Sequence, residues 1–269
     1  MPKLIVQADD LAITHAATLG TIHSVKAGMV RAAGLFTNRP DAAFAAAELA
    51  GITRLDLGLD LNLVTGAPLL SADQVPGLVG LDGNFRTSHQ IKASHRTVAQ
   101  EGFYSTFEPE PFDHEQTLAE ARAQLVRFFE LVGRPPAYVH HHSIISPMLD
   151  QVLHEVAAEA GVPVMDDLLR YHRVHQVENS WYAAPFSAEA QAGCDPIGAF
   201  EAQLDAIAAH EISLLIVHPG YLDAELIDIT SYHIVRARDL ELVSSQRVLA
   251  MLADRGIELA SYTSSGLSW

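Results

Sequence analysis

Cysteine is almost absent from this chain of 269 residues, because Cys194 is the only one. A single thiol excludes a disulfide framework within the chain and a cluster of thiolate metal ligands. We interpret Cys194 as an inert thiol in the interior or in a loop. A metal site in this protein would therefore have to use carboxylates and imidazoles.

Basic residues are also few, with 17 Lys and Arg against 33 Asp and Glu, which gives a formal net charge of −16 at pH 7. Such a field repels phosphate backbones and anionic lipids, so we expect neither nucleic acid nor a membrane as a partner. A neutral or cationic small-molecule substrate fits this charge. An anionic substrate would need a local cation, and a bound metal could supply it.

Long apolar runs are missing as well. No stretch reaches the roughly 18 apolar residues of a membrane span, and the opening MPKLIVQADD turns acidic too early for a secretion signal. Apolar residues nevertheless make up 49% of the chain, enough for a large core. We expect a cytoplasmic protein folded as a single domain over residues 1–269.

Short apolar runs alternating with helical patterns are abundant. The helical spacing in 115–131 follows Asp113 and Gln116, whose spacing indicates a capping box. A second helix over 147–160 begins with Pro147 after a Ser146 cap and stops at Gly161. Seven runs are typical of buried strands: 4–8, 30–36, 55–64, 137–139, 162–165, 213–218 and 257–262. This alternation predicts an α/β fold, an irregular TIM-like (β/α) barrel of seven or eight parallel strands. A doubly wound open sheet is the alternative, because periodicity does not separate the two.

Two longer stretches, 82–114 and 170–197, interrupt the alternation. The first contains Phe85 and the second contains Trp181. Long loops on barrels often form lids or walls of binding sites, so these aromatic residues are candidate substrate contacts. Ordinary surface excursions are the alternative interpretation.

Carboxylates and imidazoles gather at the ends of four predicted strands. The carboxyl ends of parallel strands meet at one rim, so side chains placed there converge. The residues concerned are Asp9, Asp10, Asp60, Asn62, the run His140–His142 and His218. Each also has a simpler interpretation: Asp10 as a helix cap, Asp60 on an exposed edge strand, the histidines as a solvated turn, His218 as a core imidazole.

A carboxylate and imidazole set without thiolates suits Zn²⁺, Mn²⁺, Fe²⁺, Co²⁺ or Ni²⁺, and also Mg²⁺ as carboxylates increase. Such sites usually serve hydrolysis, because a bound metal lowers the pKa of water from 15.7 towards about 7. A neighbouring carboxylate then takes the water proton, and an imidazole protonates the leaving group. Asp9 and Asp10 are adjacent, so they can divide the roles of base and ligand.

Several motifs occur in a characteristic order. These are ADD after the first strand, GLDLNLVTGAPL, the histidine run, HPGY, and SYHIVRARDLELVSS. Together they resemble the YdjC-like, or chito-oligosaccharide deacetylase, family of carbohydrate deacetylases. The resemblance implies an irregular (β/α) barrel, a divalent metal held by an aspartate and two histidines, removal of acetyl groups from N-acetylated sugars, and a dimer.

Carried over to this chain, the resemblance implies Asp9 as the base, Asp10 as a ligand and His218 as a general acid or oxyanion partner. From the histidine run, alignment on the upstream proline makes His142 the ligand, whereas alignment on the downstream helix favours His140. We take His142 first and His140 second.

The chain departs from the family pattern in several places. The family's Gly-Leu-His-Leu-Asn-Leu has Asp60 in place of its ligand histidine, and Asn-Ala-Asp-Asp-Phe-Gly becomes QADDLA. The Asp-Ser-His-x-His-Val-His run is only partly kept. Asp60 retains a ligand but adds a negative charge, which weakens the Lewis acidity of the ion. It therefore favours harder metals or a substrate more reactive than a sugar acetamide.

We therefore predict a metal-dependent amide hydrolase, most simply a homodimeric deacetylase of an N-acetylated sugar, using Mg²⁺, Zn²⁺ or Mn²⁺. A barrel that has lost catalysis and only binds a sugar or metabolite is the alternative. A sugar isomerase fits less well, because the strand ends lack a Lys or a second Glu set. The predicted residues are Asp10, Asp60, His142 and His140 for the metal, Asp9 and His218 for catalysis, and Asn62, Tyr221, Phe85 and Trp181 for the substrate.

Overall fold

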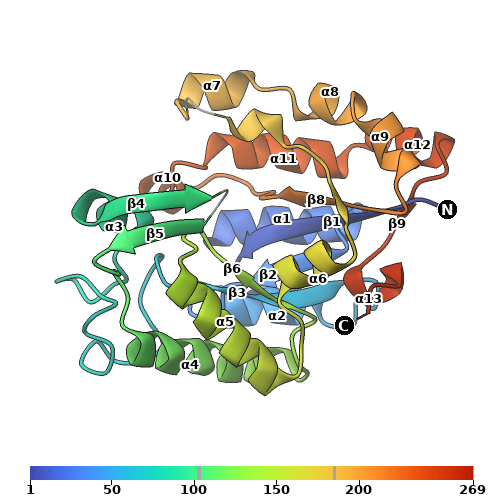
Figure 1. Cartoon of the computed structure of the whole chain (residues 1–269). Helices are drawn as coiled ribbons and strands as arrows, with labels where there is room; N and C mark the ends of the chain where they lie inside the picture. The colour runs from blue at the N-terminus through green and yellow to red at the C-terminus, as the bar shows by residue number, and fades with distance from the viewer. Residues whose placement is uncertain (102–103, 184–185, 269) are drawn as a thin grey trace.

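A computed structural model describes residues 1–101, 104–183 and 186–268 of the chain. Within these residues a parallel sheet of seven strands runs in the order β6-β3-β2-β1-β8-β7, and β9 pairs with the start of β1 (Figure 1). The strands are β1 (Lys3–Leu11), β2 (Ala32–Leu35), β3 (Asp56–Leu61), β6 (Val139–His141), β7 (His175–Gln176), β8 (Ile212–Val217) and β9 (Glu258–Leu259). The sheet curls into a half-barrel, so the expected irregular (β/α) barrel is confirmed.

The central strands are buried on both faces. Every residue of β1 after Lys3 is buried, as is all of β3. Strands covered on both sides read as nearly continuous apolar runs, which explains why their positions are visible in the sequence. The few polar residues within these strands are therefore buried too, and need partners.

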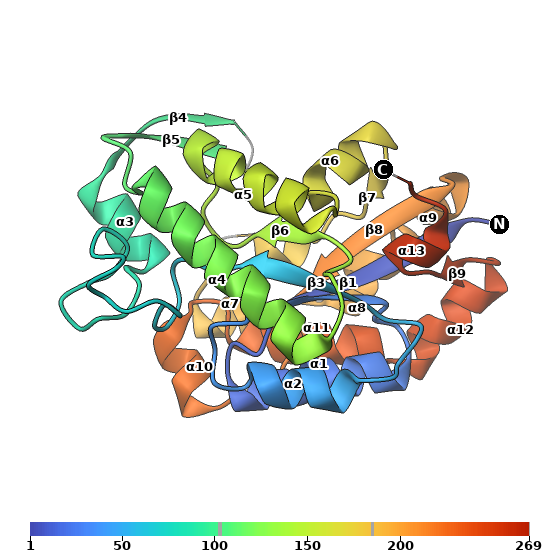
Figure 2. The same ribbon diagram turned by 90° about the horizontal axis from the view of Figure 1, so that it is seen from below.

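A shell of helices covers the outside of the sheet. Neighbouring helices follow one another in the order α11, α1, α2, α4, α5, and Figure 2 shows them curving around the strands. The longer helices are α1 (His15–Ala27), α2 (Ala42–Leu49), α4 (His114–Val132), α5 (Pro147–Ala160), α11 (Ile234–Ser244) and α12 (Gln246–Asp254). Shorter ones are α3 (Ser88–Ser94), α6 (Met165–Tyr171), α7 (Ala188–Gly193), α8 (Pro196–Glu201), α9 (Leu204–Ala209), α10 (Ala224–Ile229), α13 (Tyr262–Ser265) and the 3₁₀ turn η1 (Ser180–Tyr182).

The predicted N-caps of α4 and α5, Asp113 and Ser146, are confirmed, but Gln116 does not complete a capping box, because its side-chain oxygen accepts a hydrogen bond of 2.6 Å from the backbone of Gly77. Asp113 accepts a hydrogen bond of 3.0 Å from the backbone of Gln116, and Ser146 accepts one of 3.2 Å from the backbone of Leu149. Gly161 ends α5 with a φ of 66°, a left-handed conformation that glycine adopts without strain. In the described segments no helix has both the length and the apolar character needed to cross a bilayer.

Two predictions of local structure were wrong. Residues 162–165 do not form a strand: Val164 makes only an isolated bridge to Val139, because α6 begins at the next residue. The stretch 82–114 is not irregular either, since it contains α3 and an antiparallel hairpin of β4 (Arg96–Glu101) and β5 (Tyr104–Glu108). The extra strand β7 escaped prediction because its two residues are polar.

The turn after β8 is held tightly against α1. A β-carbon on Gly20 would lie 2.5 Å from the α-carbon of Gly220, so only glycine allows this approach. Thr21 donates a hydrogen bond of 2.9 Å to the carbonyl of Pro219. These contacts fix the backbone of the turn that follows His218.

Candidate metal centre

The carboxyl ends of β1, β3, β6 and β8 bring together polar side chains that are distant in sequence. Asp60 and His140 are direct partners across the β3–β6 ladder, so their side chains project to the same side of the sheet. Ala8 pairs with Val217 across the β1–β8 ladder, which places Asp9 beside His218. The convergence expected from the strand-end rule is therefore present.

Asp9, Asp60 and His140 form a set that could hold a metal ion. One ligand atom from each lies within 4.8 Å of the others. Nδ1 of His140 is 3.4 Å from Oδ1 of Asp60 and 3.7 Å from Oδ2 of Asp9. Two carboxylates and one imidazole, all at least half-buried, are a donor set that divalent ions such as Mn²⁺, Mg²⁺ or Zn²⁺ accept.

Two atoms of this set are buried without a hydrogen-bond partner among the residues that the structure describes: Oδ1 of Asp60 and Nδ1 of His140. Leaving such groups unpaired is unfavourable by about 1–3 kcal/mol or more for each group. A cation between them would satisfy both and would offset the two carboxylate charges. The residues present therefore fit a divalent ion.

The pKa values of Asp9 and His140 also indicate that this set favours positive charge. Burial, followed by the nearby Asp60 carboxylate, raises the pKa of Asp9 to about 7. Burial alone would lower the pKa of His140, but Asp9 and Asp60 outweigh it and raise that pKa to about 10. Both raised pKa values mean that the set favours added positive charge.

One oxygen of Asp9 is fixed by a chain of buried hydrogen bonds. Gln7 donates to Oδ1 of Asp9 at 2.6 Å, and Tyr262 of α13 donates to the Gln7 side-chain oxygen at 2.6 Å. Oδ2 of Asp9 is therefore the oxygen turned towards His140. Neither Gln7 nor Tyr262 was predicted, although a polar residue two positions before Asp9 on the same buried strand was a usable signal.

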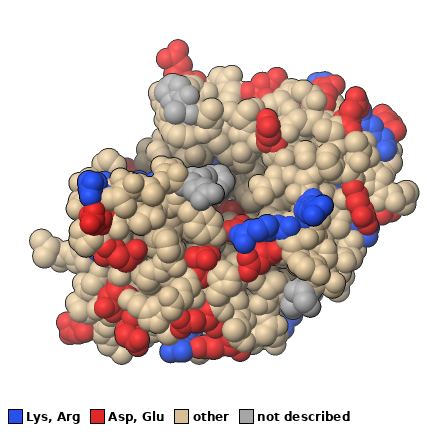
Figure 3. Space-filling view, viewed as in Figure 1, with Lys and Arg blue, Asp and Glu red and all other residues tan. Residues whose placement is uncertain are grey.

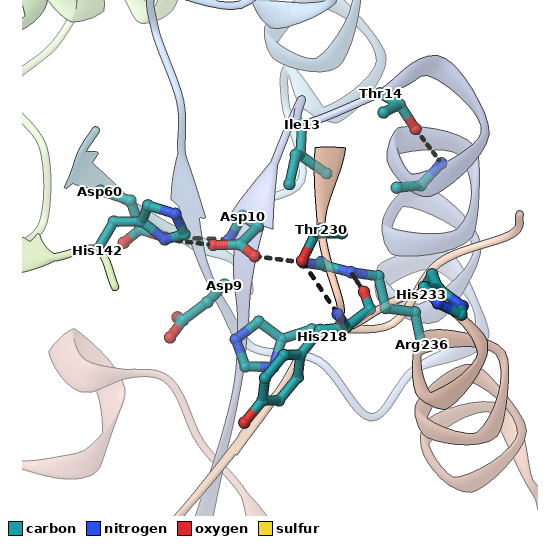
Figure 4. A network of polar contacts seen from close by, with 12 residues as sticks. Asp9, Asp10, Ile13, Thr14, Asp60, His142, His218, Thr230, His233 and Arg236 are labelled. Atoms are coloured by element: carbon teal, nitrogen blue, oxygen red, sulfur yellow. Dashed lines mark hydrogen bonds and ion pairs between the residues drawn. The ribbon is translucent and has the colours of Figure 1, made fainter. Parts of the chain in front are cut away.

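Asp10 belongs to a different cluster from Asp9. Its Oδ1 lies 2.9 Å from Nδ1 of His142, and its Oδ2 accepts a hydrogen bond of 2.5 Å from Arg236. Figure 4 shows the Asp10 carboxylate between these two side chains, with Asp9 pointing elsewhere. Asp10 has a φ of 63°, a strained conformation for a residue other than glycine. That backbone twist helps to turn the two adjacent carboxylates in different directions.

Arg236 and His142 also set the charge state of Asp10. Burial alone would raise the pKa of Asp10, but these two neighbours hold it well below its usual range. Asp10 is thus a permanent anion and a poor proton acceptor. Its backbone N–H donates to Oδ2 of Asp60 at 3.1 Å, which ties this cluster to the metal set.

Hydrogen bonds fix His218 at its backbone N–H and at Nδ1 of its ring. Its Nδ1 lies 2.9 Å from the hydroxyl of Tyr182, and its backbone N–H donates to Oδ2 of Asp239 at 2.8 Å. Burial, more than any neighbouring charge, lowers the pKa of His218 to about 4, against the opposing effect of Asp10. The imidazole is therefore neutral at physiological pH and able to accept a proton.

The residues predicted to contact substrate have other contacts in the structure. Phe85 is buried in the main core. Trp181 is largely buried and donates to Asp239 at 2.8 Å. Tyr221 is partly exposed, with its hydroxyl 2.6 Å from Nδ1 of His23 on α1. Their contact with substrate stays a prediction.

The side chain of Asn62 is fully used in shaping its own loop. Its amide nitrogen donates to Asn38 at 2.9 Å and to the carbonyl of Thr65 at 2.8 Å. Its oxygen accepts from the backbones of Val64 and Thr65. These bonds order the loop after β3, and contact of Asn62 with substrate stays a prediction.

Comparison with known proteins places this architecture in a family. Residues 3–254 match the family described as YdjC-like protein. The chain belongs to the YdjC-like family. Its resemblance to that family, seen first in the motif order, is thus confirmed over nearly the whole chain.

Two relatives of this YdjC-like chain are named carbohydrate deacetylases. Carbohydrate deacetylase 2 of Listeria innocua is 28% identical, with 97% of each chain covered. Carbohydrate deacetylase of Geobacillus stearothermophilus is 27% identical, covering 97% of this chain and 98% of the relative. The family match over residues 3–254 includes the four strand ends that carry the candidate site.

Solved structures share the fold. A protein of Enterococcus faecalis, provisionally assigned to cellobiose-phosphate cleavage, has a TM-score of 0.74 at 24% identity and covers 97% of this chain and 98% of its own. The catalytic domain of peptidoglycan N-acetylglucosamine deacetylase from Eubacterium rectale has a TM-score of 0.52 at 10% identity, covering 98% of this chain and 90% of its own. At these identities the likeness concerns the fold alone.

Proposed function

We propose that this YdjC-like chain is a divalent-metal-dependent hydrolase that removes an acetyl group from an N-acetylated sugar or a related small amide. The observation that carries the proposal is the convergence of Asp9, Asp60 and His140, two of them with orphaned buried atoms, next to a neutral His218. The full-length relatives named carbohydrate deacetylases support the substrate class.

Asp9, Asp60 and His140 would hold the ion. This differs from the roles expected from the family resemblance, in which Asp10 and His142 bind the metal and Asp9 is the base. We reassign them because Asp10 is committed to Arg236 and His142, whereas Asp9 faces His140. When bound, a divalent ion supplies Lewis acidity, which polarises a carbonyl group and makes water easier to deprotonate.

His218 would move the proton. As the water oxygen forms its bond to the acetyl carbonyl carbon, the imidazole takes one water proton and becomes imidazolium. It then returns that proton to the sugar nitrogen as the carbon–nitrogen bond breaks. The products are the free amino sugar and acetic acid, which ionises in water. Asp10, fixed as an anion nearby, favours the transient imidazolium electrostatically.

The negative surface fits this substrate class. Figure 3 shows many acidic and few basic side chains on one face, as the net charge of −16 leads us to expect. A neutral acetylated sugar enters such a field without repulsion, and the amine released is cationic. The acetate released is anionic, so the field disfavours its return.

The test measures bound metal and acetate release from N-acetylglucosamine oligomers and simple amides. We expect acetate release that a chelator abolishes and that Mn²⁺, Mg²⁺ or Zn²⁺ restores. Asp9→Asn should lose both metal and activity, whereas Asp73→Asn, at an exposed position, should keep both. Full turnover by Asp9→Asn would remove Asp9 from the site. Sugar binding by calorimetry, without metal and without acetate release, would favour a barrel that only binds.

A further inference from the structure

Asp239 is a fully buried carboxylate on α11 that accepts hydrogen bonds from three donors. Trp181 donates to its Oδ1 at 2.8 Å, and the backbone N–H of His218 donates to its Oδ2 at 2.8 Å. The hydroxyl of Tyr182 makes a short hydrogen bond to the same Oδ2. Burial raises the pKa of Asp239 to about 6, so the group is mainly ionised at pH 7 and above. Three donors around one carboxylate fit the ionised form.

The direction of each hydrogen bond follows from this charge. Tyr182 has one hydroxyl proton, and the ionised Asp239 carboxylate takes it as an acceptor. The oxygen of Tyr182 is then left to accept. Its two remaining contacts are the backbone N–H of His218 at 3.1 Å and Nδ1 of His218 at 2.9 Å. Nδ1 must therefore carry a proton.

The other ring nitrogen, Nε2, lies on the opposite edge of the imidazole. No hydrogen bond to it occurs among the described residues of the chain, and Figure 4 shows the ring beside Asp10 and Arg236 with one edge towards Asp9. The ring of Tyr182 packs edge-on against His218 at a centroid distance of 5.3 Å, which limits rotation of the imidazole. If neutral His218 carries its proton on Nδ1, its Nε2 is unprotonated and faces the strand ends.

We propose that Tyr182 and Asp239 are positioning residues that hold neutral His218 as its Nδ1–H tautomer, so that Nε2 is the atom that accepts a proton. The catalytic meaning of this tautomer rests on the proposed function, because Nε2 is the nitrogen that would take the water proton and pass it to the sugar nitrogen. The opposite tautomer could only donate at that position. Neutral His218 therefore has no N–H to offer an oxyanion at that position. Of the two roles that the family resemblance implies, general acid and oxyanion partner, only the first remains, and His218 takes it up once it has accepted the water proton.

The tautomer can be read directly by nitrogen NMR of protein labelled with ¹⁵N-histidine, with the His218 signals assigned from a His218→Gln variant. In the wild type we expect a protonated Nδ1 and an unprotonated Nε2 at pH 8. Tyr182→Phe removes the acceptor of the Nδ1 proton and keeps the ring, so the proton should move to Nε2. Tyr232→Phe is the matched control, because it removes a hydroxyl from the same aromatic cluster without a hydrogen bond to Nδ1 of His218.

Kinetics give the second readout. Tyr182→Phe should lower kcat by roughly 100-fold, the lower range for loss of general acid–base catalysis, with little change in KM. Asp239→Asn, which keeps the shape but not the charge, should change the tautomer in the same direction and lower kcat. An Nε2–H signal in the wild type, or an unchanged tautomer in Tyr182→Phe, would overturn the proposal.

The two readouts separate this inference from the proposed function. If the wild type shows the Nδ1–H tautomer and Tyr182→Phe reverses it, but no acetylated substrate is cleaved, the positioning holds and the deacetylase function fails. If acetate is released and Tyr182→Phe loses activity without a change of tautomer, the deacetylase function holds and the positioning fails.

Discussion

The carboxylate of Asp60 lies directly against the backbone of Gly34. A β-carbon on residue 34 would come within 1.9 Å of Oδ1 and 2.2 Å of Oδ2 of Asp60, far closer than any non-bonded contact allows. The two residues stand on the neighbouring strands β2 and β3, and Asp60 is almost completely buried. Gly34 thus provides the space in which this candidate ligand sits.

Gly34→Ala should therefore displace the Asp60 carboxylate. We expect metal affinity to fall at least 10-fold, the smaller effect seen when groups that orient ligands are lost, with destabilisation of about 1–3 kcal/mol from overpacking. Calorimetric titration with Mn²⁺ and urea unfolding measure the two effects. Gly193→Ala is the control, because a β-carbon there meets no atom within 4 Å. Unchanged Mn²⁺ affinity in Gly34→Ala would show that Asp60 is not a ligand.

Asp60 should also decide which metal is preferred. Two carboxylates and one imidazole favour hard ions, whereas one carboxylate and two imidazoles favour Zn²⁺. We expect Asp60→His to raise the ratio of Zn²⁺ to Mg²⁺ affinity, and Asp60→Asn to weaken both. Competition titrations followed by elemental analysis measure this ratio. An unchanged ratio in Asp60→His would mean that residue 60 does not touch the ion.

Asp9 should make the metal-free protein less stable as the pH rises. Its folded pKa is raised to about 7, above the unfolded value near 4, so the folded state binds the extra proton between these values. Stability is therefore lost from about pH 4 to pH 7 and then levels off. In the presence of a chelator, Asp9→Asn should gain unfolding temperature over the wild type, by more at pH 8 than at pH 5. A gain that is equal at both pH values would contradict the raised pKa.

The ion pair of Asp10 and Arg236 should contribute strongly to stability. Both side chains are only 3% exposed, so removing one partner leaves an uncompensated buried charge. We expect Arg236→Met to lower the free energy of unfolding by about 3–5 kcal/mol. The double variant Asp10→Asn/Arg236→Met should recover part of that loss, because neither charge remains. Urea unfolding of the double-mutant cycle measures the coupling, and additive effects would show that the pair is not coupled.

Local patterns in the sequence were enough for most of the fold. Buried strands and amphipathic helices alternate with distinct periodicities, and the N-caps of α4 and α5 were visible as Asp113 and Ser146. The run at 162–165 was wrongly predicted as a strand, and the hairpin β4–β5 was missed. Whether a short segment forms a strand depends on the segment that it pairs with, and the sequence of the short segment does not specify that partner.

The residue types at the site could also be predicted, but their roles could not. Arg236 and Asp239 stand three apart on one face of α11 and were quoted only as part of a motif. Their partners lie far away in the chain, as Arg236 does from Asp10 at a separation of 226 residues. No local pattern indicates which of two adjacent carboxylates such a distant side chain will contact.

The sequence by itself determined that carboxylates and imidazoles would meet at one edge of a parallel sheet, because strand direction and the alternation of side chains are local properties. Only the tertiary structure decided that Asp9 faces His140 while Asp10 faces His142 and Arg236. The physical reason is that the direction of each carboxylate depends on the left-handed backbone at Asp10 and on hydrogen bonds from Gln7 and Arg236, which form only when the strands and α11 have packed.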